Sequence, residues 1–123
     1  MVEYSFLKRQ REYMRYLILS LLLISNVSYA ATASWYGGKF HGRTTASGEK
    51  FNKWAMTTAS NSHKMGTKLL VTNKANGKSV VVKVNDTGGF KKYGRTLDLS
   101  RGAFAKIADI NKGLIDVTIK KVK

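Results

Sequence analysis

Apolar and polar positions alternate along the C-terminal half of the chain, at the period of strands that are buried on one face. Residues 79–86, S-V-V-V-K-V-N-D, are the clearest case, and β-branched residues dominate there. Residues 68–73 form a second apolar stretch, and Asn76-Gly77 between the two is a strong signal for a two-residue hairpin turn. Residues 115–119 alternate again. We therefore predict a β-hairpin and, farther along the chain, a final strand.

The stretches before residue 68 are shorter and are interrupted by glycines. The elements expected there are a strand at residues 31–36, a strand or structured loop at 39–45, a turn at 46–51, a strand at 54–59 and a polar loop at 60–66. Near the C-terminus, helical spacing predicts one short helix, with Ser100 as its N-cap and Ala103, Phe104, Ile107 and Ala108 on its apolar face. Many short strands with glycine turns and a single short helix indicate an all-β barrel or sandwich.

Two aspartates stand where functional carboxylates are often held. Asp86 ends the alternating stretch and precedes Thr87-Gly88-Gly89, so we expect it at the end of a strand, on a loop. Asp98 lies between Leu97 and Leu99 and should point away from both leucines if this run is a strand. Each also has a structural interpretation, Asp86 as a turn former and Asp98 as a cap of the following helix.

Residues 1–30 have the pattern of a secretory signal peptide. A basic stretch with four Lys and Arg residues precedes an apolar run at residues 16–24, which is too short to span a bilayer. Ser28-Tyr29-Ala30 offers small residues at the third and first positions before a cut, so cleavage after Ala30 is expected. An uncleaved N-terminal anchor is the alternative. The chain has no cysteine, so no lipid can be attached through one at the new N-terminus.

Residues 31–123 would form one small and strongly basic domain. They hold 18 of the 22 Lys and Arg residues and five of the seven acids, for a formal charge of +13. Such a charge on an exported domain favours an anionic partner, either a cell-wall polymer, a membrane surface or nucleic acid. Nucleic acid ranks low, since no nucleic-acid-binding motif occurs. No metal or other cofactor is expected, because cysteine is absent and His41 and His63 lack a partner at metal-ligand spacing.

Four motifs occur together in an order that is found in a known protein family. Residues 33–51 read A-S-W-Y-G-G-K-F-H-G-R-T-T-A-S-G-E-K-F, and residues 66–73, 76–86 and 94–100 follow with G-T-K-L-L-V-T-N, N-G-K-S-V-V-V-K-V-N-D and G-R-T-L-D-L-S. This set resembles the rare lipoprotein A (RlpA) family over nearly all of residues 33–122. The resemblance implies a six-stranded double-psi β-barrel, a fold shared with expansins and barwin-like proteins. It also implies export and action on peptidoglycan, since characterised members are lytic transglycosylases that cut glycan strands lacking stem peptides.

The resemblance further implies which residues act. The family's motif glutamate is Glu49 here and its motif aspartate is Asp86, while Asp98 resembles the catalytic aspartate of expansin-related endoglucanases. A lytic transglycosylase must protonate the glycosidic oxygen, after which the sugar's own 6-hydroxyl attacks and leaves a 1,6-anhydro end. One acid that later acts as a base therefore suffices. We expect Glu49, Asp86 and Asp98 to be catalytic.

Two positions depart from the family pattern. The family's histidine, eleven residues after the glutamate, is Ser60 here, with His63 three residues farther on, and Thr87-Gly88-Gly89 stands where Arg-Gly-Pro is usual.

Aromatic rings would stack on sugar faces, although Trp35 could equally belong to the core. The residues expected to bind substrate are Trp35, Tyr36, His41, Ser60, His63 and Tyr93.

Three functions remain open on these grounds. The first is an endolytic lytic transglycosylase, the second a non-catalytic wall-binding or wall-loosening module of expansin type, and the third a secreted inhibitor or toxin-like effector. The expected partner is peptidoglycan glycan or another anionic wall polymer. We expect a monomer in the periplasm or the extracellular wall, neither a lipoprotein nor stably inserted in a membrane once the signal peptide has been cleaved.

Overall fold

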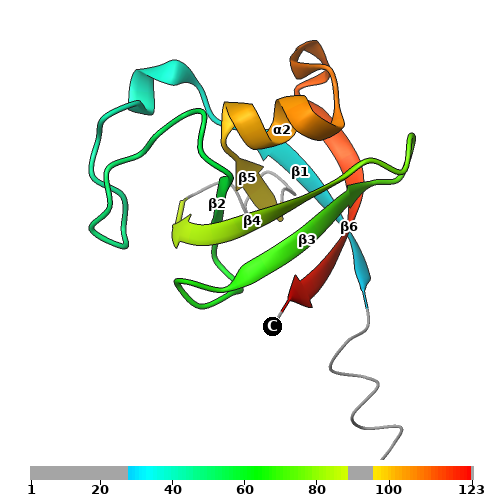
Figure 1. Cartoon of the computed structure of the whole chain (residues 1–123), viewed down its shortest axis with the longest axis horizontal. Helices are drawn as coiled ribbons and strands as arrows, with labels where there is room; N and C mark the ends of the chain where they lie inside the picture. The colour runs from blue at the N-terminus through cyan, green and yellow to red at the C-terminus, as the bar shows by residue number, and fades with distance from the viewer. Residues whose placement is uncertain (1–27, 89–95, 123) are drawn as a thin grey trace, which may run out of the picture.

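The strands predicted by the alternation close into one barrel (Figure 1). The computed structural model of the protein describes residues 28–88 and 96–122. The elements are β1 (Tyr29–Trp35), η1 (Gly38–Phe40), β2 (Thr57–Ser60), β3 (Lys68–Asn73), β4 (Ser79–Asp86), β5 (Leu97–Leu99), α2 (Arg101–Ile107), η3 (Ile110–Lys112) and β6 (Leu114–Val122). In the described residues, six strands follow one another around the barrel in the order β1-β5-β2-β4-β3-β6. The predicted fold, a six-stranded double-psi β-barrel with one short α-helix, is confirmed.

The hairpin predicted at Asn76-Gly77 joins β3 and β4. The two strands pair antiparallel, with Leu69 opposite Val82 and Val71 opposite Val80, and all four of these side chains are buried. Gly77 has a φ of +75°, a conformation that favours glycine. The hairpin therefore follows directly from the period-2 pattern and the turn residues.

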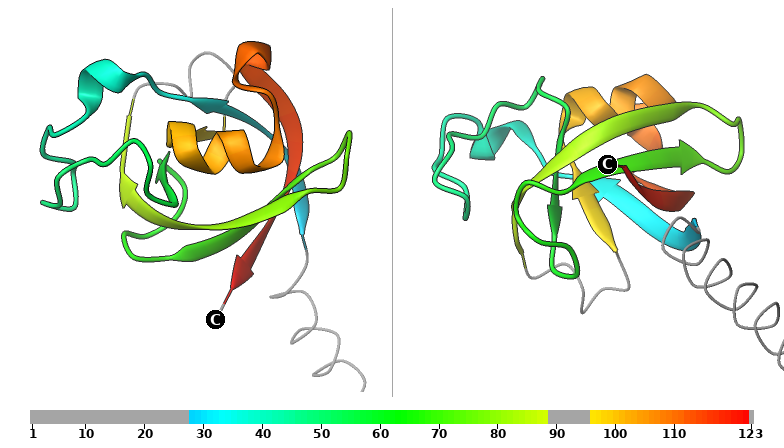
Figure 2. Two further views of the ribbon diagram at one scale, coloured as in Figure 1. Left: turned by 45° about the horizontal axis from the view of Figure 1, so that its top comes forward. Right: turned by 60° about the horizontal axis from the view of Figure 1, so that its bottom comes forward.

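Helix α2 lies across one end of the barrel (Figure 2, left). The predicted N-cap is confirmed, because the Ser100 side chain accepts a hydrogen bond from the Ala103 N–H. Ala103, Phe104 and Ile107 face the barrel and are fully buried among its valines and leucines. Burial of one such large side chain stabilises the fold by about 1.5–3 kcal/mol. No helix within the described residues is long and apolar enough to cross a membrane.

Two expected strand starts differ from the structure. Strand β1 begins at Tyr29, which pairs with Ile119 of β6, so the strand starts two residues before the expected mature N-terminus. Strand β2 begins at Thr57 rather than at residue 54. The reason is a turn closed by Asn52, whose side chain and backbone carbonyl accept the Trp54 and Ala55 N–H groups and so occupy donors that a strand would need.

The segment between β1 and β2 is a structured loop, one of the two alternatives expected for residues 39–45. It extends to one side of the barrel (Figures 1 and 2), and an isolated bridge pairs Thr44 with Lys50. Phe51 stacks on Tyr36 at 4.3 Å between ring centroids, and Phe40 meets Tyr36 edge-on at 5.8 Å. This small aromatic cluster fixes the loop against the outer face of the barrel.

Candidate active site

Two of the three expected catalytic acids lie in one row across the outer face of the barrel. Asp98 of β5 pairs with Ser34 of β1 on one side and with Ala59 of β2 on the other. Ala59 in turn pairs with Asp86 of β4. Residues paired in this way project to the same face of a sheet. Adjacent strands are about 4.8 Å apart, so the Cα atoms of Asp86 and Asp98 are about 10 Å apart.

A β-bulge brings Asp86 onto this face. The register between β2 and β4 runs from Thr58 opposite Val84 to Ala59 opposite Asp86, so Asn85 is an extra residue in β4. Val84 is fully buried in the core, and in a regular strand Asp86, two residues later, would point the same way. The extra residue reverses the alternation. The prediction that Asp86 ends its strand is confirmed.

Asp98 points away from its flanking leucines, as predicted. Leu97 and Leu99 are fully buried in the core, whereas Asp98 is only partly buried on the opposite face. The Ser34 hydroxyl donates to Asp98 Oδ1 at 2.9 Å. The alternative role of Asp98 as a helix cap is wrong, because Ser100 caps α2.

The Asp86 carboxylate is held by backbone donors from two segments. Its Oδ1 accepts from the N–H of Ala46 at 3.0 Å and from that of Thr87 at 2.9 Å. The Ser47 N–H also donates to the Asn85 carbonyl at 3.2 Å, which ties the 45–49 turn to the end of β4. Two backbone donors on one oxygen fix the direction of this carboxyl group. The bond to Thr87 is that of a turn former, so the structural interpretation of Asp86 also describes part of its environment.

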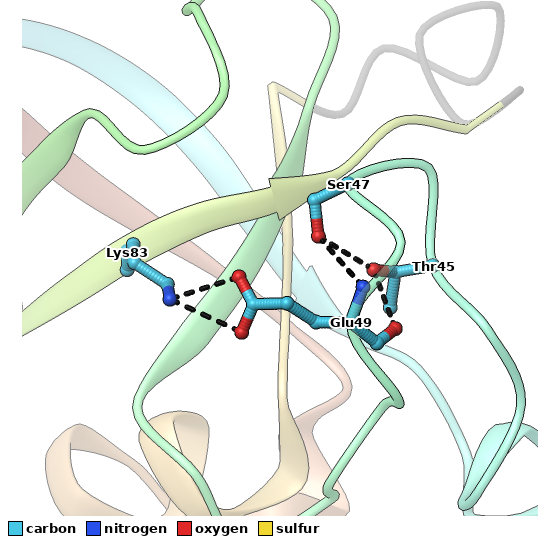
Figure 3. A network of polar contacts seen from close by, with 4 residues as sticks. All are labelled: Thr45, Ser47, Glu49 and Lys83. Atoms are coloured by element: carbon cyan, nitrogen blue, oxygen red, sulfur yellow. Dashed lines mark hydrogen bonds and ion pairs between the residues drawn. The ribbon is translucent and has the colours of Figure 1, made fainter.

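Glu49 lies on the same turn but pairs with a lysine (Figure 3). Its carboxylate oxygens are 2.9 and 3.1 Å from Lys83 Nζ. Thr45 anchors the turn, since its Oγ1 donates to the Glu49 carbonyl at 2.9 Å and lies 2.9 Å from Ser47 Oγ. Both charged side chains are almost half exposed, so a ligand can reach this ion pair and open it.

Tyr36 places a buried phenol beside the two aspartates. Burial is the main cause that raises the pKa of Tyr36 above its ordinary value, and the charges of Asp86 and Asp98 add to it in that order. The phenol is therefore neutral at physiological pH and can donate a hydrogen bond. Its hydroxyl has no hydrogen-bond partner among the described residues.

Buried polar atoms without a hydrogen-bond partner lie around this row. In the described part of the chain, the buried side-chain polar atoms without a partner are Tyr36 Oη, Thr57 Oγ1 and Asn85 Oδ1. Thr57 lies two residues before Ala59 in β2, and Asn85 is the extra residue of the bulge. Buried polar atoms are nearly always paired in folded proteins, so a cluster of unpaired ones beside two carboxylates points to a site that a polar ligand completes.

The remaining expected binding residues do not join this row. The Trp35 indole N–H donates to the Ile110 carbonyl at 2.9 Å, and its ring packs on Phe104. Trp35 therefore belongs in part to the core, which is the alternative interpretation of this residue. His41 accepts the Lys53 N–H on Nδ1 at 3.2 Å, so it braces the loop. Tyr93 lies outside the described residues.

Ser60 and His63 contact each other away from the acids. Ser60 is fully buried and pairs with Leu97, so it faces the core side of β2. Its Oγ is 3.1 Å from His63 Nδ1, and His63 Nε2 is 3.0 Å from the Tyr29 hydroxyl, with the two rings stacked. Burial and, less strongly, Lys121 lower the pKa of His63. The position of the family's histidine is thus closed to a ligand at the outer face.

Sequence reasoning missed two features of the surface near the site. Lys83 pairs with Glu49, 34 residues away, and nothing in the local sequence indicates this contact. Trp54 was assigned to a strand, yet it is 58% exposed on the loop before β2. Its polar neighbours Asn52 and Lys53 were the available sequence signal for this exposure.

No group of three or more His, Cys, Asp or Glu residues within residues 28–88 and 96–122 could hold a metal ion.

Solved structures of other proteins share this barrel. A single-residue mutant of an expansin from Clavibacter michiganensis, in complex with cellohexaose, is 25% identical, with a TM-score of 0.64 over 79% of this chain and 51% of the expansin. A papain inhibitor from Streptomyces has a TM-score of 0.63 over 79% of this chain and 96% of the inhibitor, and its 22% identity shows the fold alone.

Sequence relatives carry the family's name. A protein of Synechocystis, named a probable endolytic peptidoglycan transglycosylase RlpA, is 48% identical over 74% of this chain. The endolytic peptidoglycan transglycosylase RlpA of Neisseria meningitidis is 39% identical over 80% of this chain. The matched region spans only 28% and 41% of those two proteins. The sequence model of the family described as lytic transglycolase matches residues 28–119. The chain therefore belongs to this RlpA-like lytic transglycolase family of double-psi β-barrel domains.

Proposed function

We propose that this domain is a lytic transglycosylase that cuts peptidoglycan glycan strands. The observation that carries the proposal is the row on the outer face, where Asp86 and Asp98 flank Ala59 and Tyr36 Oη lies beside them without a partner. The names of the relatives agree with it. A site with two carboxylates and unpaired polar atoms suits a substrate that is rich in hydroxyl groups and that reacts by proton transfer.

The reaction moves two protons and exchanges one bond at the anomeric carbon. A carboxyl group gives its proton to the glycosidic oxygen as the bond from C1 to that oxygen breaks, and the positive charge that develops on the sugar is stabilised by a nearby carboxylate. The sugar's 6-hydroxyl then bonds to C1, and a carboxylate takes the hydroxyl proton. Asp86, held by two N–H donors, suits the carboxylate role. We assign the exchange of a proton with the substrate to Asp98, whose Oδ1 accepts a hydrogen bond from the Ser34 hydroxyl.

Glu49 would act at the rim of the site. An ion pair requires a deprotonated carboxyl group, so Glu49 in contact with Lys83 is not a proton donor. A bound glycan that draws Lys83 away would free Glu49 to join the reaction. This arrangement keeps Glu49 among the proposed catalytic residues and makes its contribution depend on substrate.

Tyr36 would bind the sugar through its hydroxyl. The phenol is neutral and has an unused donor, so it can donate to a sugar oxygen beside the two aspartates. The ring itself is stacked on Phe51. The expectation that Tyr36 stacks on a sugar face is therefore replaced by a hydrogen-bonding role for its hydroxyl.

Export and a wall location complete the proposal. A peptidoglycan substrate lies in the periplasm or outside the cell, and residues 1–30 have the pattern of a signal peptide. The +13 charge of residues 31–123 favours retention on anionic wall polymers. We propose that the protein works there as a monomer.

The test is Asp86→Asn, with Asp109→Asn as its matched control. The amide keeps an oxygen for the Ala46 and Thr87 donors, so the melting temperature should stay within a few degrees. Release of 1,6-anhydro products from peptide-free glycan strands, followed by mass spectrometry, should fall by about 10²-fold or more. Asp109 caps η3 from the surface, and its amide variant should match the wild type. An Asp86→Asn protein that is stable and fully active would remove Asp86 from the mechanism.

A non-catalytic wall-binding module is the second candidate function. It is favoured by the structural likeness to an expansin that was solved with a glucan oligosaccharide. Sedimentation with purified sacculi separates the two candidates. Binding without any anhydro product from the wild-type protein would support the module and exclude the transglycosylase.

A further inference from the structure

A guanidinium group lies between two indole rings at the start of helix α2. Arg101 Cζ is 5.7 Å from the ring centroid of Trp35 and 5.8 Å from that of Trp54. Each contact lies within the range of a cation–π interaction. Two rings hold the planar guanidinium more firmly than one, so its N–H groups are fixed in direction before any ligand arrives.

The Trp35 ring and the backbone of Trp54 are both anchored. Trp35 donates its indole N–H to the Ile110 carbonyl and packs on Phe104. Trp54 lies on a loop that is joined to α2 by the Gly102 N–H, which donates to the Lys53 carbonyl at 2.8 Å. A Cβ atom on Gly102 would lie 2.6 Å from the Trp54 carbonyl oxygen, so only glycine allows this approach. The cluster is thus built by the fold.

The cluster carries positive charge that no residue in the described part of the chain neutralises. No acceptor among the described residues lies within hydrogen-bond or ion-pair distance of the Arg101 guanidinium; the described ion pair joins Lys83 and Glu49 instead. Lys53 Nζ is 5.1 Å from the Trp54 ring centroid, which places a second cation at the same indole. Two neighbouring cations repel each other, and an anion between them would relieve that repulsion.

We propose that Trp35, Arg101 and Trp54 form a binding site for a pyranose that carries a carboxylate. The forked guanidinium of Arg101 can donate two parallel hydrogen bonds to the two oxygens of one carboxylate. The exposed Trp54 ring offers an apolar face on which a sugar ring can lie. A chain of glycerol phosphates has no sugar ring to place there. Ring and fork together therefore favour an acidic sugar over a phosphate polymer. No residue of this site belongs to the row of Asp86 and Asp98.

The site is close enough to the row to hold the same polymer. Arg101 is three residues from Asp98, so their Cα atoms are at most about 11 Å apart. The muramic acid of peptidoglycan is an acidic pyranose, with a lactyl carboxyl group that is free only where no peptide is attached. The choice of this substrate rests on the proposed function, but binding at Arg101 can be measured without any cleavage.

The experiment compares two forms of one ligand on two proteins. The ligand is a peptide-free tetrasaccharide of alternating N-acetylglucosamine and N-acetylmuramic acid, either as the free acid or as its methyl ester. Titration calorimetry with the wild-type protein should show the acid binding at least about tenfold more tightly than the ester, the value of a hydrogen-bonded charge pair. In Arg101→Lys, which keeps the charge but loses the fork, this preference should shrink to about twofold or less.

Matched controls separate this site from general charge and from the reaction. Lys106→Gln removes one positive charge from the exposed side of the same helix and should leave the acid-to-ester ratio unchanged. On the wild-type protein, the NMR signal of the Trp54 indole N–H should move with the acid and much less with the ester. That measurement also covers the case in which Arg101→Lys fails to fold.

Three results would overturn the proposal. They are an unchanged acid-to-ester ratio in Arg101→Lys, equal movement of the Trp54 signal with acid and ester, and tighter binding of a glycerol phosphate polymer that is lost in Arg101→Lys. The last result would assign the site to a phosphate polymer. None depends on turnover, so a domain that binds as proposed but releases no anhydro product would contradict only the transglycosylase function.

Discussion

Tyr36 serves the fold with its ring and, as we propose, the site with its hydroxyl. Its ring stacks on Phe51 and belongs to the aromatic cluster that holds the β1–β2 loop. Its hydroxyl, by contrast, is buried without a protein partner, which costs folding free energy. Ring and hydroxyl can therefore be separated by a single substitution.

We predict that Tyr36→Phe separates activity from stability. The melting temperature should stay level or rise slightly near neutral pH, since an unsatisfied hydroxyl is removed. Anhydro-product release should fall by about tenfold or more, the value of a hydrogen bond to a polar transition state. A large loss of stability with unchanged turnover would show that the hydroxyl serves the fold.

The same substitution should change the pH dependence of stability. Burial and the two aspartates raise the pKa of Tyr36 in the folded protein above its ordinary value of 10.0. Above pH 10 the unfolded chain therefore loses this proton first, and the folded state loses stability as pH rises. Melting curves should show a steeper alkaline loss for the wild type than for Tyr36→Phe, whereas parallel losses would mean that other tyrosines dominate.

Single residues differ in how much of their role the sequence reveals. The place of Asp86 at the end of its strand and the outward direction of Asp98 follow from strand alternation and turn chemistry, which are local. The burial of Ser60 and its contact with His63 depend on β5 and on the start of β1, and the exposure of Trp54 depends on its packing against α2. Long-range contacts of this kind leave no periodic signal.

At the scale of elements, the bulge in β4 decides which face carries Asp86. Alternation predicts the strand well, because every second residue is buried up to Val84. It cannot predict the bulge, since Asn85 is accommodated by the pairing with β2, a strand that lies some twenty residues earlier in the chain. The row of acids is thus a product of strand pairing.

The contact between α2 and the β1–β2 loop yields a test at this scale. Gly102→Ala places a Cβ atom within 2.6–2.9 Å of three Trp54 backbone atoms, so the loop or the helix must shift. We expect a loss of about 1–3 kcal/mol in the free energy of unfolding, as for other overpacked positions. Denaturant unfolding measures it.

Gly37→Ala is the matched control. Gly37 has a φ of −77°, and an added Cβ meets nothing within 4 Å. Its stability should therefore equal or slightly exceed that of the wild type. Equal effects of the two substitutions would show that the loop does not rest on the helix as described.

The whole molecule combines a small neutral core with a strongly basic surface. The barrel buries its valines, leucines and isoleucines without a disulfide or a cysteine of any kind. The formal charge of the full chain is +15. Composition and the resemblance of four motifs were enough to predict the fold class and the family, because both depend on patterns spread over most of the chain.

The surface charge predicts how binding to the wall responds to salt. Exposed charges are screened over about 10 Å at 0.1 M salt and over about 3 Å at 1 M. Sedimentation with purified sacculi should therefore weaken steeply between 0.1 M and 1 M sodium chloride. Binding that is constant across this range would mean that stacking and hydrogen bonds, rather than charge, hold the protein on the wall.

The signal peptide that the sequence predicts would make the pairing of β1 matter during export. The expected cut falls between Ala30 and Ala31, and in the finished barrel these residues pair with Thr118 and Val117 of β6. Proteases cut backbone that is free of such pairing. Strand β6 is made last, so a signal peptide at residues 1–30 would have to be removed before β1 and β6 pair. In that case a chain whose β1 and β6 pair first would keep residues 1–30.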